Sequence, residues 1–138
     1  MMSNPVQPFE AARDRTRNVL FAPQSQGLDA AWLGEVDDLF RPAGLSLLRV
    51  GSGREAIARV ERGGLAAAML LPDSASSDGL ALLRIIRSID TELPCWLLTN
   101  DHSRSTLEAA FSLSVTCVIK HPPTRASLSL AVQRLVGG

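Results

Sequence analysis

Asp101, His102 and His121 are the residues whose types best suit a metal site. Imidazole nitrogens and carboxylate oxygens both bind transition metals. The first two residues follow one short apolar run and His121 follows the next run, so adjacent strands would bring all three to one edge of a sheet. The three residues share no ligand-spacing motif. We therefore predict surface residues and no bound metal, with a metal site as the alternative.

Cys95 and Cys117 are the only cysteines, and they are separated by the same number of residues as Thr99 and His121. This shared offset would place the two thiols side by side on paired parallel strands, within reach of a disulfide. Buried strands in a reducing compartment favour two unreactive core thiols instead, and that is our prediction.

The segment Gly51-Ser52-Gly53 resembles the start of a phosphate-binding loop, but the rest of such a motif is missing. A dinucleotide fingerprint needs a third glycine, and a P-loop needs Gly-Lys-Ser/Thr. We predict a turn followed by a helix start. No nucleophile and base stand at a useful spacing either, so the sequence predicts neither an enzyme nor a cofactor.

The composition narrows the class of protein further. The chain has 138 residues, 46% of them hydrophobic, with 14 Lys+Arg against 14 Asp+Glu. Zero net charge argues against binding to nucleic acid or to an acidic membrane surface. No apolar run approaches the length of a transmembrane helix, and the N-terminal residues lack the apolar core of a secretory signal. We predict a cytoplasmic protein with residues 1–16 as a flexible leader and residues 17–138 as one domain.

Two kinds of sequence pattern alternate along the chain, and they predict the elements that must position these residues. Short runs that are apolar throughout occupy residues 19–22, 45–50, 65–71, 95–99 and 115–119. Amphipathic patterns with helical spacing cover about residues 28–40, 53–61, 80–89, 103–111 and 124–135. The short apolar runs fit strands that are buried on both faces of a parallel sheet. The alternation predicts an α/β fold with helices on both sides of the sheet.

Four segments resemble motifs of one family, the receiver domains of bacterial two-component response regulators. They are Gly53-Arg54-Glu55-Ala56-Ile57, Asp78-Gly79-Leu80-Ala81-Leu82-Leu83-Arg84-Ile85-Ile86-Arg87, Pro94-Cys95-Trp96-Leu97-Leu98-Thr99 and Val118-Ile119-Lys120-His121-Pro122-Pro123. They occur in the family's order and on the expected elements. The resemblance implies a three-layer α/β/α sandwich with a five-stranded parallel sheet of order 2-1-3-4-5 and five helices.

The resemblance also implies which positions would run the family's phosphotransfer chemistry. An aspartate at the end of the third strand accepts the phosphoryl group, and an acidic pair after the first strand holds Mg²⁺. Here the acidic pair corresponds to Pro23 and Gln24, and the acceptor corresponds to Leu71, seven residues before Asp78. None of these three side chains carries a carboxylate. The resemblance therefore implies a degenerate pseudo-receiver.

Two further positions of the phosphotransfer site differ in how well they match. The switch hydroxyl after the fourth strand is retained as Thr99. The lysine of the Lys-Pro turn corresponds to His121, although Lys120 stands one residue earlier. The aromatic residue often found near the start of the fifth strand corresponds to Val118.

Two alternatives remain open for this edge of the sheet. Asp73 lies two residues past Leu71, and a shift of two residues along a strand keeps the same face, so Asp73 could be a displaced phosphoacceptor. The second alternative is a small-ligand sensor that uses the vacated pocket near Pro23, Leu71, Thr99 and His121, which is less polar without its carboxylates.

The leading prediction is a signalling module that works by protein–protein contact without conventional aspartate phosphorylation. The resemblance implies a homodimer through the fourth helix, fifth strand and fifth helix, here residues 103–114, Lys120 and residues 125–134. Leu130 lies off the apolar stripe of Leu128, Val132 and Leu135, so we expect it to be an exposed anchor. The Gly137-Gly138 end is either a linker to an output domain or a natural tail.

Overall fold

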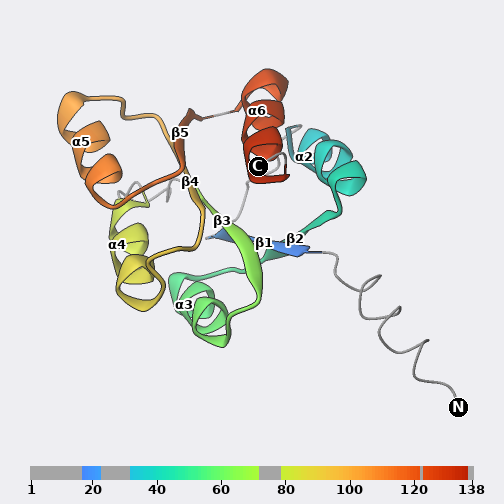
Figure 1. Ribbon diagram of the computed structural model, residues 1–138. Helices are drawn as coiled ribbons and strands as arrows, with labels where there is room; N and C mark the ends of the chain where they lie inside the picture. Colours follow the sequence, from blue (N-terminus) through green and yellow to red (C-terminus); the bar gives the residue numbers. More distant parts are fainter. Residues whose placement is uncertain (1–16, 23–31, 72–78, 122, 137–138) are drawn as a thin grey trace, which may run out of the picture.

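The computed structural model describes residues 17–22, 32–71, 79–121 and 123–136 (Figure 1). Within them, five strands form one parallel sheet in the order β2-β1-β3-β4-β5. The strands are β1 (Arg17–Ala22), β2 (Leu45–Arg49), β3 (Leu65–Leu70), β4 (Cys95–Thr99) and β5 (Cys117–Lys120). The predicted strand order is confirmed.

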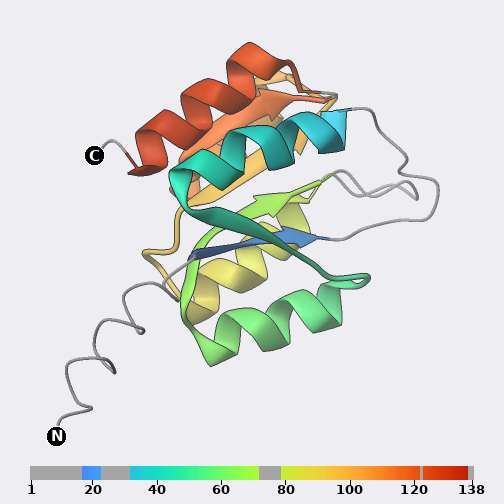
Figure 2. The same ribbon diagram turned by 90° about the vertical axis from the view of Figure 1, so that its right-hand side faces the viewer.

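The helices of the described residues cover both faces of this sheet, as Figure 2 shows. They are α2 (Trp32–Phe40), the 3₁₀ helix η1 (Arg41–Ala43), α3 (Gly53–Arg62), α4 (Leu80–Ile89), α5 (Arg104–Ser112) and α6 (Arg125–Val136). Helices α2 and α6 lie on one face, and α3, α4 and α5 lie on the other (Figure 1). The predicted three-layer sandwich with five α-helices is confirmed. No helix of the described part is long and apolar enough to cross a membrane.

The core follows from strands that are apolar on both faces. Val19 and Phe21 of β1 pack beneath α2 and α6, whereas Leu20 and Ala22 pack beneath the other three helices. Side chains alternate between the two faces of a strand, so each buried strand supplies two hydrophobic cores. Burial of both faces fixes the register and with it the positions at the ends of the strands.

The segment predicted as a turn and helix start is confirmed as one. The Ser52 hydroxyl accepts a hydrogen bond from the Glu55 backbone N–H at 3.1 Å, and the Glu55 carboxylate accepts one from the Gly51 N–H at 2.9 Å. These bonds are similar to a capping box, except that the Glu55 carboxylate binds the N–H of the residue before the Ser52 cap, and they satisfy N–H groups at the start of α3. They account for the loop without a phosphate.

Gly79 brings the start of α4 against the ends of two strands. Its φ is +84°, and a Cβ at this position would lie 2.9 Å from the Leu97 Cδ1 and 3.5 Å from the Leu71 carbonyl oxygen. Both the left-handed backbone and the close approach therefore require glycine here.

The cysteine register was predicted wrongly by one residue. Cys117 lies opposite Trp96, and the neighbour of Cys95 is Thr116, whose N–H donates to the Cys95 carbonyl at 2.8 Å. Because one residue changes the face of a strand, Cys95 packs on the α3–α5 side and Cys117 on the α2–α6 side. Both thiols are free, which agrees with the prediction of unreactive core residues. Burial raises the pKa of Cys95 to about 11.

The apolar spacing in α5 was also misleading. Leu107, Ala110 and Phe111 have helical spacing within the pattern predicted at residues 103–111, but only Ala110 among them is fully buried, and Phe111 is 58% exposed. Thr106 takes the second buried position of this helix. Its side chain is buried because the preceding loop supplies a hydrogen-bond partner, which apolar periodicity does not reveal.

Candidate functional site

The first element of the candidate site is Leu71, at the carboxyl end of β3. Its N–H donates to the Ala22 carbonyl at 2.9 Å, which extends the pairing of β1 and β3 by one residue. The side chain is 1% exposed and packs in the core that contains Met69, Trp96 and Leu98. The Leu71 side chain offers only carbon atoms, so it provides neither a nucleophile nor a metal ligand.

The second element is Thr99, at the carboxyl end of β4, which is also 1% exposed. The Thr99 hydroxyl oxygen accepts a hydrogen bond from the Asp101 N–H at 2.9 Å. The Thr99 carbonyl accepts the His121 N–H at 3.1 Å and lies 3.1 Å from the His102 Nε2. Thr99 therefore organises the loop that follows β4 and ties this loop to the end of β5.

Asp101 ties this loop to the start of α5. Its carboxylate accepts hydrogen bonds from the Thr106 hydroxyl at 2.7 Å and from the Ser103 N–H at 2.9 Å. The Ser103 hydroxyl in turn accepts from the Thr106 N–H at 3.3 Å, so Ser103 is the N-cap of α5. The hydrogen bond from Thr106, followed by those from Ser103, lowers the pKa of Asp101 below its usual 3.8.

The alternative metal site does not form in the described part of the chain. No group of three histidine, cysteine, aspartate or glutamate residues is arranged there to hold a metal ion. The Asp101 carboxylate is engaged by Ser103 and Thr106, and the His102 ring contacts the Thr99 carbonyl. Burial lowers the pKa of His121 below 6.5. Asp101 and His102 are exposed, as predicted for surface residues, whereas His121 is half-buried.

The end of β5 presents both candidates for the lysine position. Lys120 lies opposite Thr99 in the sheet and is exposed. His121 follows it and makes the backbone bond to Thr99. Val118, two residues before Lys120, is half-buried and packs on the α3–α5 side. Since side chains alternate along a strand, Lys120 emerges on this same side of the sheet.

Three of the residues predicted for this site, Pro23, Gln24 and Asp73, lie outside the described residues. Leu71, Thr99 and His121 are therefore the predicted positions that the structure locates at this edge. Leu71 and Thr99 are both almost fully buried, so neither side chain presents a surface to a small ligand. The contribution of Thr106 was not foreseen, and the Ser103 cap three residues earlier was the signal that could have indicated it.

Comparisons with known proteins identify the fold through solved structures. No protein-family model matches the chain, and no curated protein matches it. A CheY-like response regulator receiver domain protein from Methanospirillum hungatei superposes with a TM-score of 0.70 at 14% identity, over 88% of this chain and 94% of that one. The chain has the fold of response-regulator receiver domains.

Two other solved structures show how widely this fold is shared. The receiver domain of a sensor histidine kinase from Pseudomonas aeruginosa, with a magnesium ion coordinated in its active-site cleft, gives a TM-score of 0.66 at 18% identity, covering 88% of this chain and 98% of that one. A protein proposed to be pilus assembly-related from Burkholderia pseudomallei gives 0.66 at 24% identity, covering 89% and 91%. At these identities the likeness concerns the fold.

Proposed function

We propose that the chain is a degenerate receiver, a cytoplasmic signalling module that acts by protein–protein contact and neither accepts a phosphoryl group on an aspartate nor catalyses a reaction. The observation that carries this proposal is Leu71. It directly follows β3, where the receiver fold places its phosphoacceptor, and its buried side chain is part of the hydrophobic core.

The chemistry of magnesium supports this proposal. Mg²⁺ binds to oxygen ligands, chiefly carboxylates and water, in a strict octahedral arrangement. At the described end of β3 the side chain is a hydrocarbon, and in the sequence Pro23 and Gln24 take the place of the acidic pair. These side chains do not fit the cation, so the negative charge of a phosphoryl group would lack the divalent counter-ion of the family's chemistry.

Exposure to acetyl phosphate or beryllofluoride with Mg²⁺ tests the proposal directly. We expect no added mass and no change in the fluorescence of Trp96, which is buried with its ring centroid 6.0 Å from that of Phe40. A receiver domain with a complete acidic site serves as the positive control. Stoichiometric phosphorylation that disappears in Asp73→Asn would show a displaced acceptor and contradict the proposal.

The interaction surface that we propose is the α5–β5–α6 face, which the chain would use to form a homodimer. Phe111 of α5 and Leu130 of α6 are 58% and 50% exposed, and Lys120 at the end of β5 is exposed. The exposure expected for Leu130 is thus observed. Large apolar side chains surrounded by polar residues are typical of protein interfaces.

Sedimentation velocity of Phe111→Glu and Leu130→Glu tests this face. Each substitution places a charge at the centre of the proposed interface, and we expect dimerisation to weaken at least tenfold. Arg49→Glu, at the exposed end of β2 on the opposite edge of the sheet from β5, is the control and should leave dimerisation unchanged. Unaltered dimerisation in both interface variants would exclude this face.

A further inference from the structure

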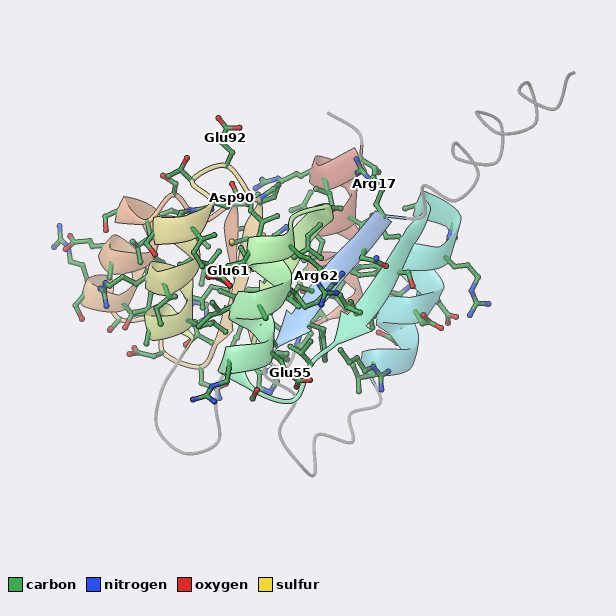
Figure 3. All side chains as sticks on the ribbon, turned by 90° about the horizontal axis from the view of Figure 1, so that it is seen from below. Arg17, Glu55, Glu61, Arg62, Asp90 and Glu92 are labelled. Carbon is green, nitrogen blue, oxygen red and sulfur yellow. The ribbon has the colours of Figure 1, made fainter. Side chains whose placement is uncertain are left out.

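A second apolar surface lies along the neighbouring helices α3 and α4, away from the α5–β5–α6 face. The two helices run side by side on one side of the sheet (Figures 1 and 3). A Cβ on Gly53 would lie 3.9 Å from the Leu82 Cδ1, so the helices meet near their N-terminal ends. Ile85 and Ile89 of α4 are 43% and 37% exposed, one helical turn apart.

Helical spacing shows which residues of α3 border this surface. Ala56 and Val60 are buried against the sheet, and Gly53 faces α4. Residues four apart lie on the same side of a helix, so Ile57 and Glu61 follow Gly53 along the α4 side. Ile57 is half-buried, and Figure 3 shows Glu61 on the α4 side of α3 with Arg62 on the opposite side.

Opposite charges lie at the two ends of this surface. Arg54 is in the first turn of α3 and Glu61 is in the last, both exposed. They are seven residues, or two turns, apart and therefore share one side of the helix, separated by about 10 Å along its axis. Neither forms an ion pair with another residue in the described part of the chain.

We propose that this α3–α4 face binds a second copy of the chain about a twofold axis, with the α3 helices antiparallel. In this arrangement the apolar residues Ile85 and Ile89 pack against those of the second copy. Arg54 of each copy then lies opposite Glu61 of the other. A twofold interface must be complementary to itself, and a surface with a positive end, an apolar centre and a negative end meets this condition.

This proposal goes beyond the proposed function, because it assigns a second interface on different helices. A chain with two distinct twofold faces can join copies into assemblies larger than a dimer. The test therefore uses the Phe111→Glu/Leu130→Glu background, in which the α5–β5–α6 face is blocked. If that first face is not an interface, the background substitutions are silent and the test of the second face is unaffected.

Sedimentation velocity in this background measures the α3–α4 face alone. We expect a concentration-dependent dimer, and we expect Ile85→Glu or Ile89→Glu to weaken it at least tenfold. Gln133→Glu, at an exposed position of α6 on the other side of the sheet, is the matched control. Circular dichroism identifies any variant that fails to fold. A background protein that remains monomeric at all attainable concentrations overturns the proposal.

Charge reversal tests the antiparallel arrangement itself. Arg54→Glu and Glu61→Arg should each weaken self-association, because like charges then face each other across the axis. An equimolar mixture of the two single variants should form heterodimers, because every cross-copy pair is again of opposite sign. The Arg54→Glu/Glu61→Arg double variant should recover self-association.

Two outcomes contradict this arrangement. A mixture that associates no better than its components overturns it. So does a protein that dimerises through this face only after residues 1–16 are deleted, because those residues would then be the occupant of the surface.

Discussion

The carboxyl ends of β3 and β4 are equally buried but differ in chemistry. Leu71 and Thr99 are each 1% exposed. Leu71 contributes only carbon to a hydrophobic core, whereas Thr99 uses its hydroxyl and carbonyl to hold the loop after β4 and the end of β5. Two adjacent strands of one sheet can therefore end differently, one in a residue that packs in the core and the other in a residue that forms hydrogen bonds.

This difference separates the hydrogen-bonded loop after β4 from the apolar end of β3. The loop after β4 keeps a complete set of hydrogen bonds through Thr99, Asp101 and Thr106. The end of β3 keeps the backbone pairing of the fold, through the bond from Leu71 to Ala22, but has an inert side chain. The fold thus accommodates a hydrocarbon side chain at this position, because backbone bonds and packing hold the strand in place.

Substitution of Leu71 should have the largest effect on stability. Leu71→Ala removes buried carbon and leaves a cavity, so we expect the free energy of unfolding to fall by about 2–5 kcal/mol. Leu71→Asp should cost still more at pH 7, because it also buries a charge among Met69, Trp96 and Leu98. Urea denaturation followed by tryptophan fluorescence measures both.

Leu71→Met is the control, because it nearly conserves volume and should cost less than about 1.5 kcal/mol. If Leu71→Asp proved as stable as the unmodified protein, the end of β3 would have to admit water or a counter-ion. The contrast between the two strand ends would then be lost.

Substitution of Thr99 should have a smaller effect. Thr99→Val keeps the shape of the side chain but removes the acceptor of the Asp101 N–H, so we expect a loss of about 1–2 kcal/mol of unfolding free energy. Thr99→Ser keeps the hydroxyl and should preserve slow hydrogen exchange of the Asp101 amide, which Thr99→Val should accelerate. Equal exchange rates in the two variants would show that the hydroxyl does not hold this loop.

The fold could be predicted from the sequence because its strands are apolar throughout and its helices have clear boundaries. The run predicted at residues 95–99 matches β4, and Ser103 marks the start of α5. A strand that is apolar on both faces must lie between two layers of helices, which restricts where it can be placed in the fold. The parallel order was implied by the resemblance, since apolar runs alone do not specify which strands are neighbours.

The details of the site depend on interactions that periodicity does not encode. The loop before β5 sets the register that separates Cys95 from Cys117, and a single residue there moves a side chain to the other face. Phe111 has helical spacing with Ala110 and Leu107, yet it lies on the open side of α5. Thr106 is buried because its hydroxyl donates a hydrogen bond to the Asp101 carboxylate, a contact that forms only in the folded chain.

The smallest effect that we predict concerns Asp101. Its folded-state pKa is lowered, chiefly by the Thr106 hydroxyl and then by Ser103, so the folded protein binds a proton there less readily than the unfolded chain. Asp101 therefore contributes stability above pH 3.8, the usual pKa, and this contribution is lost as the pH falls through the folded-state value. Urea midpoints of the unmodified protein and Asp101→Asn should differ at pH 6 and converge at strongly acidic pH. A difference that persists unchanged at acidic pH would show that the side-chain charge is irrelevant and that Thr99 alone organises the loop.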